Sequence, residues 1–128
     1  MRFILFLSMF FYSITAWSAD LKDIYENLDV TSFNSSLRPM QISDEKLFTE
    51  FGQLPKPIMK DNEIIIEDEY WIYSIKIIKT NGNDIHVCFL DKSKEGNYDA
   101  QEPLVIRKYG KNYVAIAQMS DVCESYAR

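Results

Sequence analysis

The sequence predicts an α+β domain in which two short N-terminal helices pack on an antiparallel meander sheet of four or five strands. Three observations lead to this fold class. Apolar residues recur at helical spacing between residues 20 and 52, they alternate at strand spacing from Glu63 onward, and Asn81-Gly82 is a strong turn signal within the second region. Because the helices offer the other large apolar surfaces of the chain, we expect them to cover one face of the sheet.

The N-terminal segment differs in composition from the rest of the chain. Residues 1–18 contain an apolar run from Phe3 to Ile14, which is followed by Ala16-Trp17-Ser18. This is the pattern of a secretory signal peptide cleaved before residue 19. A membrane-spanning helix is the alternative, but the run is shorter than the about 20 residues that a bilayer requires. We therefore expect a signal peptide at 1–18 and a single exported α+β domain at 19–128, which is periplasmic or secreted and not held in a membrane once the signal is removed.

Two helices are expected before residue 52. Asp20 can cap the first helix, since Leu21, Ile24 and Leu28 then form an apolar stripe. Ser43 can cap the second helix, whose apolar face is Leu47, Phe48 and Phe51. A loop with two prolines, residues 54–57, ends this helical part.

The strands are expected in two hairpins preceded by the β-branched run Ile64-Ile65-Ile66. Tyr70–Thr80 and Asp84–Leu90 flank Asn81-Gly82, which favours a type I′ turn. Leu104–Tyr109 and Tyr113–Gln118 flank Gly110-Lys111, where glycine takes the first turn position.

The two cysteines, Cys88 and Cys123, are expected to form a disulfide because an exported chain meets an oxidising compartment. His86 is the only histidine, so Ser-His-Asp, Cys-His and HExxH machinery would all need it. A Cys-His pair with Cys88 is geometrically possible, but the disulfide is favoured. We expect no enzyme. A hydrolase with two carboxylates, next to Trp71 and Tyr73, is the catalytic alternative that stays open.

The charge of the chain points to a basic partner. The formal net charge is −5, from 14 Lys and Arg against 19 Asp and Glu. An acidic chain gains little from the phosphates of a nucleic acid and is repelled by anionic lipids, so we expect a protein partner, no nucleic acid and no membrane. The candidate contact residues are acidic side chains with one aromatic anchor: Glu67, Asp68, Glu69, Asp91, Glu95, Asp99 and Tyr98.

The polar stretch from Asp91 to Glu102 resembles the twelve-residue calcium loop of the EF-hand family. The resemblance implies a sharp turn at Gly96, a Ca²⁺ ligand from the backbone carbonyl of Asn97 and side-chain ligands of which the last is bidentate: Asp91, Ser93, Glu95, Asp99 and Glu102. Strands rather than helices are expected on both sides, which favours a polar hairpin loop with a turn at Gly96-Asn97. An isolated calcium-binding loop between strands is the alternative. We expect no cofactor, and Ca²⁺ is the one candidate ion.

Two main functions remain open. A small acidic exported protein is similar, in size and location alone, to periplasmic immunity proteins and lysozyme inhibitors, which occlude a partner enzyme. A carrier with an apolar pocket between helices and sheet is the alternative, since helices followed by strands occur in NTF2-like folds. A pocket above about 300 Å³ lined by Trp71, Tyr73 and Phe89 would favour the carrier, and a filled core with acidic loops would favour the binding protein.

Overall fold

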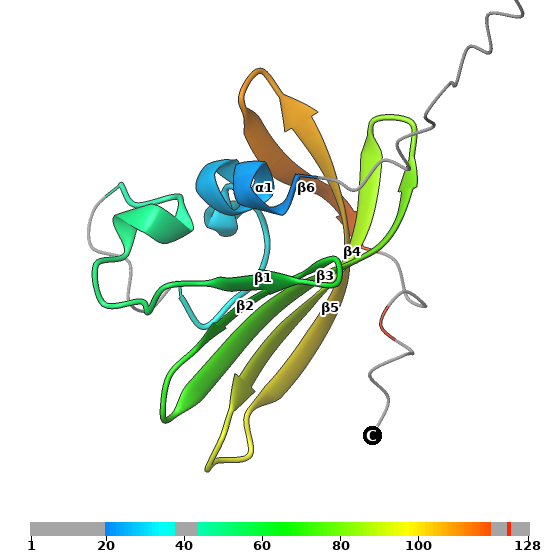
Figure 1. Cartoon of the computed structure of the whole chain (residues 1–128). Coiled ribbons are helices and arrows are strands. Elements are labelled where there is room, and N and C mark those ends of the chain that lie inside the picture. Colours follow the sequence, from blue (N-terminus) through cyan, green and yellow to red (C-terminus); the bar gives the residue numbers. More distant parts are fainter. Residues whose placement is uncertain (1–19, 38–43, 119–122, 124–128) are drawn as a thin grey trace, which may run out of the picture.

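A computed structural model of the chain describes residues 20–37, 44–118 and 123 (Figure 1). The described part contains one α-helix, α1 (Leu21–Asn27), and two 3₁₀ turns, η1 (Val30–Ser32) and η3 (Phe48–Glu50). It also contains six strands: β1 (Ile58–Lys60), β2 (Glu63–Glu67), β3 (Trp71–Asn81), β4 (Asp84–Ser93), β5 (Asp99–Tyr109) and β6 (Asn112–Gln118). The predicted fold class, α+β with one antiparallel sheet, is confirmed.

The six strands form one antiparallel meander in the order β1-β2-β3-β4-β5-β6. Two hairpin turns lie where glycine predicted them, since Gly82 and Gly110 both have a φ of 62°. The predicted type I′ turn with Asn81 and Gly82 at its centre is wrong. Asn81 pairs with Asp84, so the central residues are Gly82 and Asn83, and only Gly82 has the positive φ that a type I′ turn needs at both positions. Asp61 and Asn62, which join β1 to β2, do have positive φ at both positions.

The prediction of two helices is wrong in its second helix. The described part of the expected 43–51 segment has only the 3₁₀ turn η3, and Ser43 lies outside the described residues. The carboxylate of Glu50 accepts hydrogen bonds from the backbone N–H groups of Lys46 and Leu47, at 3.0 and 2.9 Å. This tight local loop replaces a helix because it already satisfies the backbone donors, while Phe48 and Phe51 are still buried.

The strand count is six rather than the expected four or five. The additional strand is β1, in which Met59 pairs with Ile64 of β2. A three-residue strand directly after Pro57 is too short to give an alternating pattern, so the sequence did not indicate it. The polar stretch 91–102 was also expected to be a loop, yet most of it lies in strands, because β4 continues to Ser93 and β5 begins at Asp99.

The main core lies on the concave face of the curved sheet, where α1 covers it (Figure 1). Inward-facing side chains of β2 to β6 pack there against α1 and the segments that follow it: Ile24, Leu28, Val30, Phe33, Leu37, Phe48, Ile64, Ile66, Ile75, Val87, Phe89, Leu104, Ile106 and Tyr113. Phe89, at the centre, is fully buried and meets Phe33 edge to face at 4.8 Å between ring centroids.

Helix α1 is fixed at its N-terminal end by two aspartates. Asp20 caps it as predicted, because its carboxylate accepts from the backbone N–H groups of Lys22 and Asp23. The carboxylate of Asp23 in turn accepts from Lys108 Nζ at 2.8 Å and from the Tyr113 hydroxyl at 2.7 Å. These bonds lower the pKa of Asp23. They connect the first helix to the last two strands of the sheet.

The convex face is partly buried as well. Cys88 of β4 points to this side and forms the predicted disulfide with Cys123, with 5.2 Å between the two Cα atoms. His86 and Leu90, which share the face with Cys88, are also buried.

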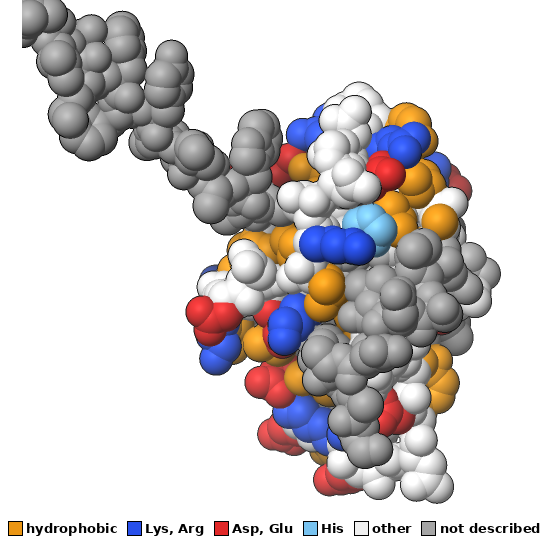
Figure 2. Space-filling view, turned by 90° about the vertical axis from the view of Figure 1, so that its right-hand side faces the viewer, with side chains coloured by type: hydrophobic (Ala, Val, Ile, Leu, Met, Phe, Trp, Pro, Cys, Tyr) orange, Lys and Arg blue, Asp and Glu red, His pale blue; other side chains and the backbone are white. Residues whose placement is uncertain are grey.

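The charged side chains on this side of the molecule are mixed in sign. Figure 2, which views the molecule from the right of Figure 1, shows positive and negative side chains interspersed rather than gathered by sign.

Candidate functional site

The turns between β2 and β3 and between β4 and β5 lie side by side at one end of the sheet (Figure 1). The backbone N–H of Lys94 donates to the carbonyl of Tyr70 at 2.9 Å, and Lys94 Nζ lies 3.0 Å from a carboxylate oxygen of Glu67. We call residues 67–70 and 94–99 together the acidic tip. It combines five acidic residues with one lysine, although the two segments are far apart in the sequence.

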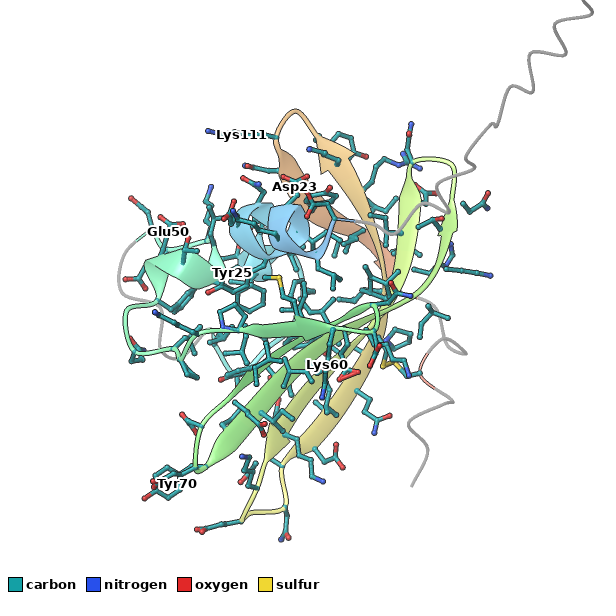
Figure 3. All side chains as sticks on the ribbon, in the orientation of Figure 1. Asp23, Tyr25, Glu50, Lys60, Tyr70 and Lys111 are labelled. Carbon is teal, nitrogen blue, oxygen red and sulfur yellow. A yellow bond between two sulfur atoms is a disulfide. The ribbon has the colours of Figure 1, made fainter. Side chains whose placement is uncertain are left out.

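The β2–β3 turn is held by one side chain. The carboxylate of Asp68 accepts hydrogen bonds from the backbone N–H groups of Tyr70 and Trp71, both at 2.8 Å. This is the Asx-turn geometry that favours aspartate in tight turns. It projects Tyr70 into solvent, where its side chain is 62% exposed (Figure 3).

The β4–β5 turn has a similar local cause. The hydroxyl of Ser93 accepts from the backbone N–H of Gly96 at 2.8 Å, and the N–H of Ser93 donates to the carbonyl of Tyr98 at 2.9 Å. A Cβ on Gly96 would lie 2.9 Å from the Ser93 hydroxyl, so glycine permits this close approach. The turn places the ring of Tyr98 5.5 Å from that of Trp71, between centroids.

Behind these rings lies a buried carboxylate. Asp91 is 1% exposed and accepts three hydrogen bonds: from the indole Nε1–H of Trp71 at 2.6 Å, from the backbone N–H of Ser36 at 2.6 Å and from the Ser36 hydroxyl at 2.8 Å. The Ser36 oxygen also lies 2.9 Å from the hydroxyl of Tyr73. Burial raises the pKa of Tyr73 to about 12. The network connects the segment after α1 to β3 and β4.

A pocket opens in front of this network. Its volume is about 210 Å³, and side chains of three segments line it: Ser36, Gln53, Leu54, Asp68, Trp71 and Tyr73. A second hollow, of about 290 Å³, lies at the β5–β6 edge beside Phe33 and Ile116. Phe89 lines neither of them.

The structure brings most of the predicted partner-binding residues together. All of them except Asp91 lie in the acidic tip, which ends at Asp99, the first residue of β5. Asp91 differs, because it is buried behind the tip and cannot be a surface contact. Its position could have been inferred from the alternation of Val87, Phe89 and Asp91 along one strand face.

The residues proposed as calcium ligands are not arranged as a cage. Both carboxylate oxygens of Asp91 accept bonds from Trp71 or Ser36, and the Ser93 hydroxyl accepts from Gly96. In the described ranges, no group of three or more His, Cys, Asp and Glu side chains is placed to hold a metal ion. The calcium hypothesis stays an untested prediction.

Sequence reasoning missed three members of the site. Ser36 was assigned no role, because a serine that donates to a buried carboxylate can be recognised only once the fold brings the two residues together. Gln53 and Leu54 lie in a loop, and only their position beside Trp71 makes them pocket residues.

The alternative of a Cys-His pair is wrong, because the sulfur of Cys88 is bonded to that of Cys123.

Within the part of the chain that the structure describes, no helix is long and apolar enough to cross a membrane. No protein-family model, no curated protein and no solved structure matches the chain.

Proposed function

We propose that the chain is a small binding protein that uses the acidic tip to dock a basic protein partner. The observation that carries this proposal is the side-by-side placement of the two turns, fixed by the bond from the Lys94 N–H to the Tyr70 carbonyl. It gathers exposed aromatic rings and carboxylates from separate strands on one projecting surface. Aromatic anchors within a charged rim are typical of protein interfaces.

The exposed side chains favour a protein partner over a small apolar ligand. Tyr70 and Tyr98 are 62% and 47% exposed, so their rings project outward rather than line a cavity. The core is filled around Phe89, and the pocket at Trp71, about 210 Å³, is below the about 300 Å³ at which small-molecule sites usually begin. These features support a binding surface more than a carrier.

The sign of the charge favours a basic partner. Five acidic residues against one lysine give the tip a negative potential, which increases the rate of encounter with a positive surface and disfavours acidic proteins. The disulfide between Cys88 and Cys123 is typical of exported proteins, so we extend the proposal to a periplasmic or secreted protein that occludes its partner as inhibitors and immunity proteins do.

The proposal is tested by capture with matched variants. The full chain, oxidised and immobilised, is incubated with the envelope fraction of its source, and bound proteins are identified by mass spectrometry. We expect a basic protein that is retained by wild type and lost with Glu69→Lys or Glu95→Lys. Glu26→Lys, on an exposed part of α1, makes the same change of charge far from the tip and should retain it. Recovery that is equal in all variants would contradict the proposal.

A further inference from the structure

We propose that the pocket at Trp71 receives one arginine side chain of the basic partner, with the guanidinium stacked on the indole and facing the Asp68 carboxylate. This inference rests on the proposed function and names the chemistry of its anchor. The pocket opens at the acidic tip, because Asp68 belongs to the tip and also lines the pocket. A side chain that enters from a partner docked on the tip therefore reaches the pocket directly.

The indole of Trp71 is suited to a cation. Its Nε1–H donates to the buried carboxylate of Asp91 at 2.6 Å. A carboxylate at the indole N–H shifts electron density toward the ring and strengthens the attraction between the ring face and a positive charge. Tryptophan is already the best of the aromatic partners for a cation.

Hydrogen-bond acceptors face the same space. The Ser36 hydroxyl donates to Asp91, so the proton between Ser36 and Tyr73 must come from the Tyr73 hydroxyl. This order leaves lone pairs on the Tyr73 oxygen for an incoming donor. Asp68 adds a carboxylate at the rim. Its bonds to the turn use only one of its two oxygens.

The size and shape of the pocket favour arginine over other cations. A volume of about 210 Å³ admits one long side chain. Leu54 and the ring of Tyr73 offer apolar surface for the methylene stem, and Trp71 brings a flat indole to the same lining. A guanidinium stacks and presents several donors at once, whereas an ammonium is a compact, strongly hydrated point charge.

The test uses single amino-acid probes, so that it does not depend on the identity of the partner. N-acetyl-arginine amide is titrated into the ¹⁵N-labelled full chain, and the Trp71 indole N–H resonance, assigned with Trp71→Phe, is followed by NMR. N-acetyl-citrulline amide is the uncharged probe of the same shape, and N-acetyl-lysine amide is the other cation. We expect saturable binding of the arginine probe, at least tenfold weaker binding of the citrulline probe, and weaker binding of the lysine probe.

Variants locate the effect. Asp68→Asn keeps an oxygen for the turn bonds but removes the charge, so it should weaken arginine binding severalfold while the other resonances stay in place. Glu26→Gln, far from the pocket, should leave the affinity unchanged. A shift that does not saturate, equal binding of arginine and citrulline, or equal binding of arginine and lysine would each overturn the inference. If the arginine probe fails while Glu69→Lys still abolishes capture of a basic protein, the pocket assignment is wrong and the docking surface stands.

Discussion

The buried carboxylate of Asp91 gives the sharpest prediction of stability. Asp91→Ala removes the acceptor of three hydrogen bonds that hold Trp71 and Ser36. A buried donor that loses its acceptor costs about 1–3 kcal/mol, and the low end applies here because both donor residues are partly exposed to water. Three donors at about 1 kcal/mol each give a loss of about 3 kcal/mol. Relief of the cost of burying the carboxylate offsets part of this, so we expect about 2–3 kcal/mol.

The assay is urea unfolding of the oxidised chain, followed by far-UV circular dichroism. Asp91→Asn keeps one acceptor oxygen at the same place and should cost less than Asp91→Ala. Glu95→Ala, in the exposed part of the acidic tip, should stay within about 0.5 kcal/mol of wild type. A loss below about 0.5 kcal/mol for Asp91→Ala would refute the view that this network holds the segment after α1 on the sheet.

Two further predictions concern contacts between segments that are distant in the sequence. Hydrogen bonds from Lys108 and Tyr113 hold the pKa of Asp23 in the folded protein below its ordinary value of 3.8. The ionised carboxylate therefore contributes its full stability above the ordinary value, and this stability is lost as the pH falls through the lower pKa of the folded protein. Asp23→Asn should reduce the acid sensitivity of unfolding, by about 1 kcal/mol or less because the pair is partly exposed; an unchanged pH profile would contradict this. Cys88→Ala/Cys123→Ala opens a cross-link between residues 35 positions apart and should cost about 3–4 kcal/mol in urea unfolding, whereas a loss below 1 kcal/mol would show that the disulfide adds little.

The sequence predicted the elements whose signals are local. Alternating apolar residues located β3, glycines located two hairpin turns and thereby β4, and Asp20 located the start of α1. The disulfide followed from the cysteine count and the expected compartment.

What the sequence did not predict depends on contacts between distant segments. Strand β4 continues through Asp91 because β3 supplies Tyr73 as its partner, which changes a polar loop into a strand. The second helix is replaced by a 3₁₀ turn because Glu50 satisfies the nearby backbone donors. The acidic residues were found from composition, but their meeting at one end of the sheet follows from strand lengths that no local pattern specifies.

The central claim is that the two turns of the acidic tip form one docking surface. The most direct test is the affinity of the captured basic partner for Glu69→Lys and for Tyr98→Ala, which change one turn each, measured beside Glu26→Lys by isothermal titration calorimetry. We predict that both tip variants weaken binding at least tenfold and that the helix variant binds as wild type does. Weakening by only one of the two tip variants, or equal weakening by Glu26→Lys, would contradict the claim.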